Sequence, residues 1–111
     1  MVIKVENKQL FILLDELKTR LVKLYGKRLF SLILFGSHAR GEATPDSDID
    51  VMAVLSDPVD VFDEISRMSD VRWYFLMEYD ELVSIIPTSE SDYLSCPRSF
   101  LRVARREGIK I

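Results

Sequence analysis

Residues 29–55 of the chain read LFSLILFGSHARGEATPDSDIDVMAVL, and this stretch decides the fold. Its first seven residues, 29–35, are apolar except for Ser31. Such a run is too short to span a membrane and is typical of a strand that is buried on both faces. The run ends at Gly36, a residue type that allows a sharp turn and a close approach of the backbone to a ligand.

A second apolar run, 51–55, follows two carboxylates. Asp48 and Asp50 stand directly before it, and ten residues separate Asp48 from Ser37. Successive strand residues point to opposite faces, so both carboxylates are expected on one face. Two close carboxylates repel each other unless a cation lies between them, and Mg²⁺ is commonly held by one or two carboxylates together with substrate phosphates.

The connection between the two runs contains the turn signal Thr44-Pro45-Asp46-Ser47. If Ser37 opens a helical turn, its hydroxyl and the free N–H groups behind it make a phosphate site. Turn chemistry alone would explain Asp48. It does not explain Asp50, because an unpaired carboxylate inside an apolar strand is costly. The pattern therefore predicts a phosphate site and a metal site at the ends of two neighbouring strands.

The sixteen residues 36–51, GSHARGEATPDSDIDV, resemble the signature of the nucleotidyltransferase superfamily that includes DNA polymerase β. They are most similar to the minimal nucleotidyltransferase domains, short proteins often paired with a HEPN-domain partner as antitoxin. The resemblance implies an α/β (α+β) fold, with a small mixed β-sheet and helices packed mainly on one face. It also implies that Asp48 and Asp50 bind Mg²⁺ and that Gly36 and Ser37 bind the triphosphate of ATP.

Active members of the superfamily usually add a third carboxylate from a neighbouring strand. The segment 81–87, ELVSIIP, is short and rich in β-branched residues, and it is predicted to be that strand. Glu81 at its start is the candidate third catalytic carboxylate. A small shift of the alignment places Ser84 there instead, and a serine cannot replace a metal-binding carboxylate.

Two further residues of the motif have alternative interpretations. Arg40 offers a fork of donors that would bind a triphosphate, and it would equally pair with Glu42 or Asp46 and shape the loop. His38 is a candidate metal ligand or base, but a single histidine without a partner favours an exposed loop residue.

The composition bounds the class of protein. The chain has 111 residues, which predicts a single domain over residues 1–111. The net charge of −3 argues against non-specific binding of nucleic acid. Cys96 is the only cysteine of the sequence, so no internal disulfide forms. The sequence contains no signal peptide and no run long enough to span a membrane, which favours a cytoplasmic protein.

The rest of the chain alternates helical patterns with short apolar segments. Helices are predicted at 7–25, with Asn7 as N-cap, and at 58–79, with a possible break near Ser69-Asp70. The dipeptide Asp57-Pro58 is expected to begin the second of these helices. A short helical turn is predicted from Ser89 or Ser91 to Leu94, a last helix at 97–107, and an apolar tail at 109–111 along the sheet.

Two surface features remain open. The last helix places basic residues on one face, which is either a solvated face or a surface that meets an anion; they are Arg98, Arg102, Arg105 and Arg106. The aromatic cluster Trp73-Tyr74-Phe75 is expected to lie in the core or on a partner-facing surface.

The resemblance implies an enzyme that transfers AMP from ATP to a hydroxyl, with a tyrosine of a HEPN-type partner as the acceptor. The protein would silence that partner as an antitoxin. The alternative is a nucleotide-binding antitoxin with weak or no catalysis, which neutralises its partner by complex formation. A small-molecule acceptor is a weaker hypothesis, because no acceptor pocket is evident.

Overall fold

The structure is a computed structural model that describes residues 8–111. Asn7, the predicted N-cap of the first helix, lies outside the described residues. The elements, in chain order, are α1 (Lys8–Tyr25), the 3₁₀ turn η1 (Gly26–Arg28), β1 (Leu29–Phe35), α2 (Ser37–Arg40), β2 (Ile49–Leu55), α3 (Val61–Arg67), α4 (Ser69–Tyr79), β3 (Val83–Ser89), α5 (Glu90–Ser95), α6 (Ser99–Glu107) and β4 (Ile109–Lys110).

The strands form one mixed sheet in the order β3-β2-β1-β4. β1 runs antiparallel to both β2 and β4, and β2 runs parallel to β3. The two strands predicted from residues 29–55 are therefore central neighbours. The apolar tail pairs with β1 through Ile109 and Lys110, as expected.

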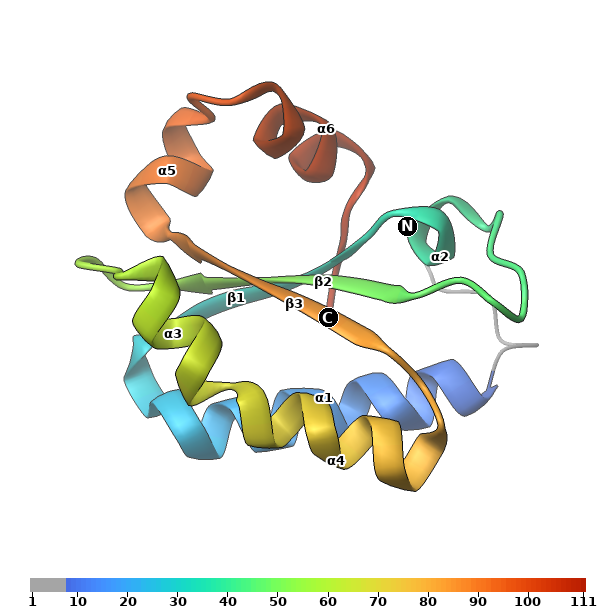
Figure 1. Cartoon of the computed structure of the whole chain (residues 1–111). Helices are drawn as coiled ribbons and strands as arrows, with labels where there is room; N and C mark the ends of the chain where they lie inside the picture. Colours follow the sequence, from blue (N-terminus) through green and yellow to red (C-terminus); the bar gives the residue numbers. More distant parts are fainter. Residues whose placement is uncertain (1–7) are drawn as a thin grey trace.

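Helices lie on both faces of this sheet, most of them on one. Helices α1, α3 and α4 cover one face, whereas α5 and α6 lie over the other (Figure 1). The larger core lies under α1 and α4, and the smaller core joins β1 and β2 to Leu101 and Ala104 of α6. The predicted mixed α+β sheet with helices mainly on one face is confirmed.

Alternate residues of β2 enter these two cores. Ile49, Val51 and Ala53 belong to the α1–α4 side, whereas Met52 and Val54 belong to the α6 side. Asp50 has the same parity as Met52, so its side chain lies on the α6 side. The strand is apolar almost throughout because both of its faces are covered.

Two predicted helix boundaries were wrong. The helix expected from Pro58 begins at Val61, because the side chain of Asp60 accepts the hydrogen bond from the backbone N–H of Asp63. It breaks at Met68, which separates α3 from α4 close to the predicted position. In the last predicted helix, the chain becomes helical only at Ser99.

A buried carboxylate joins three elements of the α1–α3 side. Glu64 is 3% exposed and accepts hydrogen bonds from the Tyr25 hydroxyl at 2.9 Å, from Arg28 at 2.9 Å and from Arg67 at 3.1 Å. Burial alone would raise the pKa of Glu64, but the hydrogen bonds from Arg28 and Tyr25 outweigh it and hold the pKa below its usual value. This ionised group therefore stabilises the packing of α3 against α1 and η1.

The aromatic cluster divides between core and surface. Phe75 is fully buried, with its ring centroid 5.2 Å from that of Tyr74 and 5.5 Å from that of Tyr79. Trp73 is exposed. Within residues 8–111, no helix is both long and apolar enough to cross a lipid bilayer.

Candidate active site

Gly36 brings the backbone directly against Asp50. It ends β1 with φ 76° and ψ −156°, a conformation that is essentially restricted to glycine. A Cβ atom built on Gly36 would overlap the Oδ2 atom of Asp50 and lie 3.2 Å from its Cγ atom. The glycine is therefore required twice, once for the turn and once for the close contact.

The turn continues into α2, which begins at Ser37, so the condition set in the sequence analysis for a phosphate site there is met. The backbone N–H of Arg40 donates to the carbonyl of Gly36 at 3.1 Å, and Gly41 ends the helix in the left-handed conformation. Ala39 is buried in the larger core and anchors the turn. Ser37 and Arg40 are thereby held beside the end of β1.

The two acidic residues lie at the start of β2. Asp48 is exposed and precedes the strand, and Asp50 is partly buried within it. Burial and the charge of Asp48 both raise the pKa of Asp50, and the charges of His38 and Arg40 only partly offset this. The two carboxylates therefore repel each other, which is the electrostatic condition that a bound cation relieves.

Ser84, and not Glu81, is the residue of β3 that pairs with Asp50. In the parallel pairing of β2 and β3, Asp50 faces Ser84 and Ile49 faces Val83. Glu81 precedes β3, and its backbone N–H donates to the carbonyl of Phe75 at the end of α4. The structure does not bring Glu81 to the face that carries Asp50.

The sequence predicts a strand over residues 81–87, but β3 begins two residues later than Glu81. The helix α4 ends at Tyr79 as predicted, and Asp80 follows it in the left-handed conformation with φ 53°. The N–H of Asp80 donates to the carbonyl of Leu76 at 3.1 Å, and Glu81 and Leu82 connect the helix to β3.

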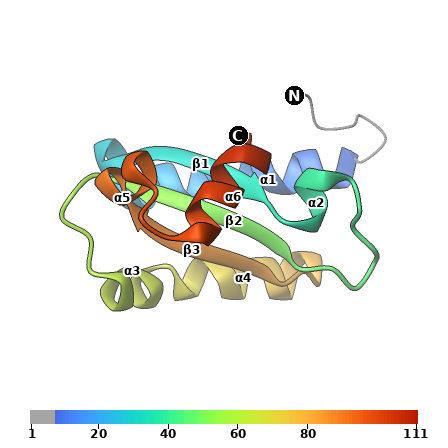
Figure 2. The same cartoon turned by 90° about the horizontal axis from the view of Figure 1, so that it is seen from above.

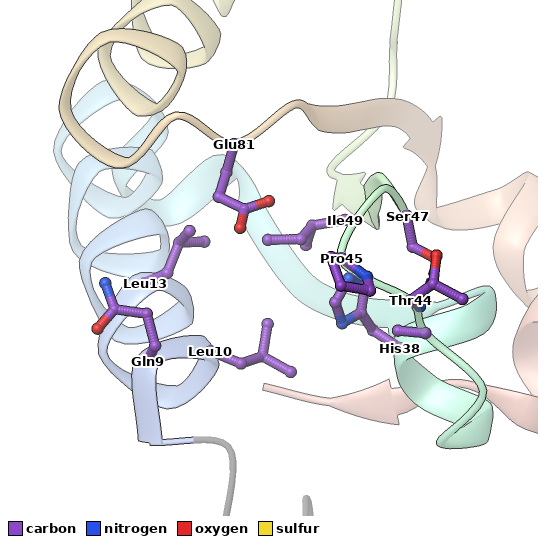
Figure 3. A pocket seen from close by; sticks show the side chains of 10 residues that line it. Gln9, Leu10, Leu13, His38, Thr44, Pro45, Ser47, Ile49 and Glu81 are labelled. Atoms are coloured by element: carbon purple, nitrogen blue, oxygen red, sulfur yellow. Dashed lines mark hydrogen bonds between the residues drawn. The ribbon is translucent and has the colours of Figure 1, made fainter.

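Glu81 instead lines a cavity of about 330 Å³ on the α1 side of the sheet. Figure 3 shows Glu81 and His38 reaching this cavity from different segments of the chain, with Leu10 and Leu13 of α1 also lining it. Both ring nitrogens of His38 are buried and lack a hydrogen-bond partner within residues 8–111. His38 is therefore not the exposed loop residue that the sequence favours.

The candidate active site opens into a larger cavity of about 570 Å³ on the α6 side. One wall is formed by Gly36, Ser37, Arg40 and Asp50, together with Phe35. The opposite wall comes from α6, and its residues are Ser99, Phe100, Val103, Ala104 and Glu107. Figure 2 shows α6 lying across the sheet on this side.

Sequence reasoning did not assign the α6 wall to the site. A signal was present, because Phe100, Val103, Ala104 and Glu107 follow the i, i+3, i+4, i+7 spacing of one helical face. The motif itself gives no reason to place that face over Gly36, since only the packing of α6 on β1 and β2 does so.

Arg40 is held by carboxylates from two segments. Its Nε atom donates to Oε1 of Glu42 at 2.8 Å, and its Nη1 atom lies 3.6 Å from Oε1 of Glu107. The pairing with Glu42 is the loop-shaping role considered from the sequence. Glu107 adds a link between α2 and α6 that the sequence did not indicate.

Most of the arginines on the last helix hold the chain between α5 and α6. Arg105 donates to the carbonyl of Leu94 at 2.9 Å, Arg102 donates to that of Cys96 at 3.3 Å, and Arg98 lies 3.7 Å from Asp92. Arg106 is exposed and has no ion-pair partner in the described part of the chain. These contacts are structural and do not by themselves create an anion site.

The donor set fits a hard divalent cation. Within residues 8–111, no three histidine, cysteine, aspartate or glutamate side chains are close enough to form a complete metal site. Asp48 and Asp50 supply two carboxylates, and Mg²⁺ typically completes such a site with water and substrate phosphates. The open cavity beside Asp50 leaves room for those phosphates.

Comparisons with known proteins agree with this geometry. The nucleotidyltransferase domain family matches residues 14–104. A Methanocaldococcus jannaschii protein, proposed to be a protein adenylyltransferase, is 32% identical over 88 residues, which cover 78% of this chain. The chain spans 60% of the length of that relative.

A solved structure supports the same fold. It belongs to a Sulfolobus solfataricus protein proposed to be a nucleotidyltransferase, and it matches with a TM-score of 0.57 at 24% identity, over 88% of this chain and 75% of the other. The family match covers most of the sequence, including the Gly36–Asp50 motif. The chain belongs to the nucleotidyltransferase domain family.

Proposed function

We propose that this protein is a Mg²⁺-dependent nucleotidyltransferase that transfers AMP from ATP to a protein hydroxyl. The observation that carries the proposal is the contact between Gly36 and Asp50, which joins a phosphate-binding turn to a carboxylate at the mouth of one cavity. Both parts are needed for nucleotidyl transfer, and the backbone of residue 36 lies so near the Asp50 carboxylate that a side chain there would overlap it.

The chain's own groups have separate tasks in this proposal. Ser37 and the backbone at Gly36 position the triphosphate, and Arg40 adds a cation beside it. When bound to Asp48 and Asp50, Mg²⁺ supplies positive charge that neutralises the phosphates. The acceptor oxygen forms a bond to the α-phosphorus as the bond to the β-phosphate bridging oxygen breaks, and pyrophosphate leaves. In this proposal the hydroxyl proton passes to the carboxylate of Asp50, and the place of Asp50 at the border of the cavity supports this role.

We propose a tyrosine of a HEPN-type partner as the acceptor, with an antitoxin role. The resemblance of residues 36–51 to minimal nucleotidyltransferase domains supports this choice. The relative proposed to be a protein adenylyltransferase supports a protein acceptor rather than a small molecule. The cytoplasmic location and the single domain over residues 1–111 stay predictions from composition.

A second candidate function is favoured by Ser84. Because a serine faces Asp50 and Glu81 lies on the other side of the sheet, the site has two carboxylates where active relatives usually have three. A protein with this site would bind nucleotide and neutralise its partner by complex formation, with little transfer.

One labelling experiment separates the two candidates. The protein is incubated with α-labelled ATP, Mg²⁺ and a HEPN-type protein as the proposed partner, and the same is done with Asp48→Ala/Asp50→Ala. The control is Asp15→Ala, which removes an exposed carboxylate from α1. Label on the partner with the wild type and the control, and none with the double variant, supports the enzyme. Neutralisation of the partner by all three proteins without any label supports the binder.

A further inference from the structure

The α6 wall of the candidate active site carries apolar side chains that face an open cavity. Phe100 is 42% exposed and Val103 is 39% exposed, although both stand on a helix whose neighbouring residues Leu101 and Ala104 are buried against the sheet. Both line the cavity that Gly36, Ser37 and Asp50 border on the other side. An exposed aromatic ring in a cavity next to a polar site is a surface that a flat apolar ligand group would cover.

The spacing along α6 relates this surface to the phosphate end. Glu107 lies at the end of α6 nearest Arg40, to which it pairs. Phe100 is seven residues earlier on the same helical face, which is about 10 Å along the helix axis. A nucleoside triphosphate whose phosphates lay at Ser37 and Asp50 would have room for its ribose and base along this face. The cavity of about 570 Å³ is large enough for the whole nucleotide.

We propose that Phe100 and Val103 form the nucleoside-binding surface of this protein, with the base stacked on the Phe100 ring. The inference rests on the nucleotide site proposed above and adds the residues that distinguish a nucleotide from a bare polyphosphate. Stacking on an aromatic side chain is tolerant of base identity, because every base has a π face. The wall offers few polar groups for reading base edges, since it contains only Ser99 and Glu107, and Glu107 is already paired with Arg40.

The test compares ATP with inorganic tripolyphosphate, which carries the charges but no nucleoside. Binding of each to the full chain is measured by calorimetry in millimolar Mg²⁺. Phe100→Ala should weaken ATP binding about tenfold or more and leave tripolyphosphate binding within about twofold. Phe100→Trp keeps an aromatic face and should retain ATP affinity. The matched control is Phe62→Ala on α3, an 84% exposed phenylalanine on the other side of the sheet.

The outcomes separate this inference from the proposed function. Unchanged ATP affinity in Phe100→Ala overturns the inference, even though wild-type binding of ATP would uphold the nucleotide site. Equal weakening of ATP and tripolyphosphate also overturns it, because Phe100 would then act on the phosphate end. If the wild type binds neither compound, the proposed function fails, and the nucleoside surface fails with it. Circular dichroism compares the total helix content of each variant with that of the wild type, and an unchanged spectrum is required before its affinities are interpreted.

Discussion

The contact between Gly36 and Asp50 can be measured as a coupling free energy. An alanine at Gly36 meets two penalties. The first is backbone strain, about 1–3 kcal/mol for a non-glycine residue in this conformation. The second is the overlap of its Cβ atom with the carboxylate of Asp50, which adds about 1–3 kcal/mol as for other overpacked sites. Gly36→Ala should therefore lower the free energy of unfolding by about 2–6 kcal/mol.

The second penalty needs the Asp50 carboxylate, so Asp50→Ala should remove most of it. We expect Gly36→Ala to cost about 1–3 kcal/mol less in the Asp50→Ala background than in the wild type. The matched control is Gly41→Ala, because Gly41 also has a positive φ, 73°, but nothing lies within 4 Å of a Cβ built on it. Its cost should be strain alone and should be the same in both backgrounds.

Urea unfolding of the wild type, the three single variants and the two double variants gives the cycle. If the effects of Gly36→Ala and Asp50→Ala add within about 0.5 kcal/mol, the close contact does not exist in solution, and the argument for one joined site is refuted. ATP binding provides a second readout. Gly36→Ala should abolish ATP binding, and Gly36→Ala/Asp50→Ala should not restore it, because Gly36 and Asp50 are both proposed to bind the nucleotide with its metal.

Other predictions follow from individual groups. Because the pKa of Glu64 is held below its usual 4.5, the ionised form of Glu64 stabilises the fold above that pH. Glu64→Gln should therefore lower the free energy of unfolding by about 2–4 kcal/mol at pH 7. Urea titrations should show that this difference in free energy from the wild type shrinks as the pH falls below 4.5. The pKa of Asp50 is raised above 3.8, so ionisation of Asp50 destabilises the folded state, and Asp50→Asn should have a higher melting temperature than the wild type at pH 7. This difference in melting temperature should disappear as the pH falls to 3.8. It should also disappear in millimolar Mg²⁺, because the metal stabilises only the wild type. His38→Leu should raise the free energy of unfolding by about 1 kcal/mol, because it removes two buried nitrogens without partners; an equal or lower urea midpoint would contradict this. Ser84→Asp restores a third carboxylate opposite Asp50 and should increase transfer of label to the partner at least about tenfold, and an unchanged rate would show that the missing carboxylate does not limit the wild type.

Features encoded within a few residues were predicted from the sequence. The apolar runs that became β1 and β2, the turn at Gly36, and the pairing of Asp48 with Asp50 all rest on local periodicity and local backbone preference. The same holds for α1 and for α5, whose N-cap Ser89 accepts the backbone hydrogen bond of Asp92. The periods of helices and strands are set by the local geometry of the backbone, so they can be recognised in the sequence without knowledge of the fold.

Features that depend on packing were not predictable in this way. Glu81 lies in the connection before β3 and lines the cavity on the α1 side, and the register of β3 with β2 places Ser84 opposite Asp50. A strand reverses the face of its side chains with a shift of one residue, so a small error in its start changes which group reaches the site.

The position of α6 is the clearest case. Its amphipathic pattern shows that one side of the helix is buried, but the partner of that side is β1 and β2, more than forty residues away in sequence. The local sequence thus determines the turn and the two acids, since each arises from neighbouring residues, and the family motif in the same stretch indicates the fold class. Only the tertiary structure decides that Ser84 pairs with Asp50 and that Phe100 lines the cavity beside Asp50, because both depend on register and packing between segments that are distant along the chain.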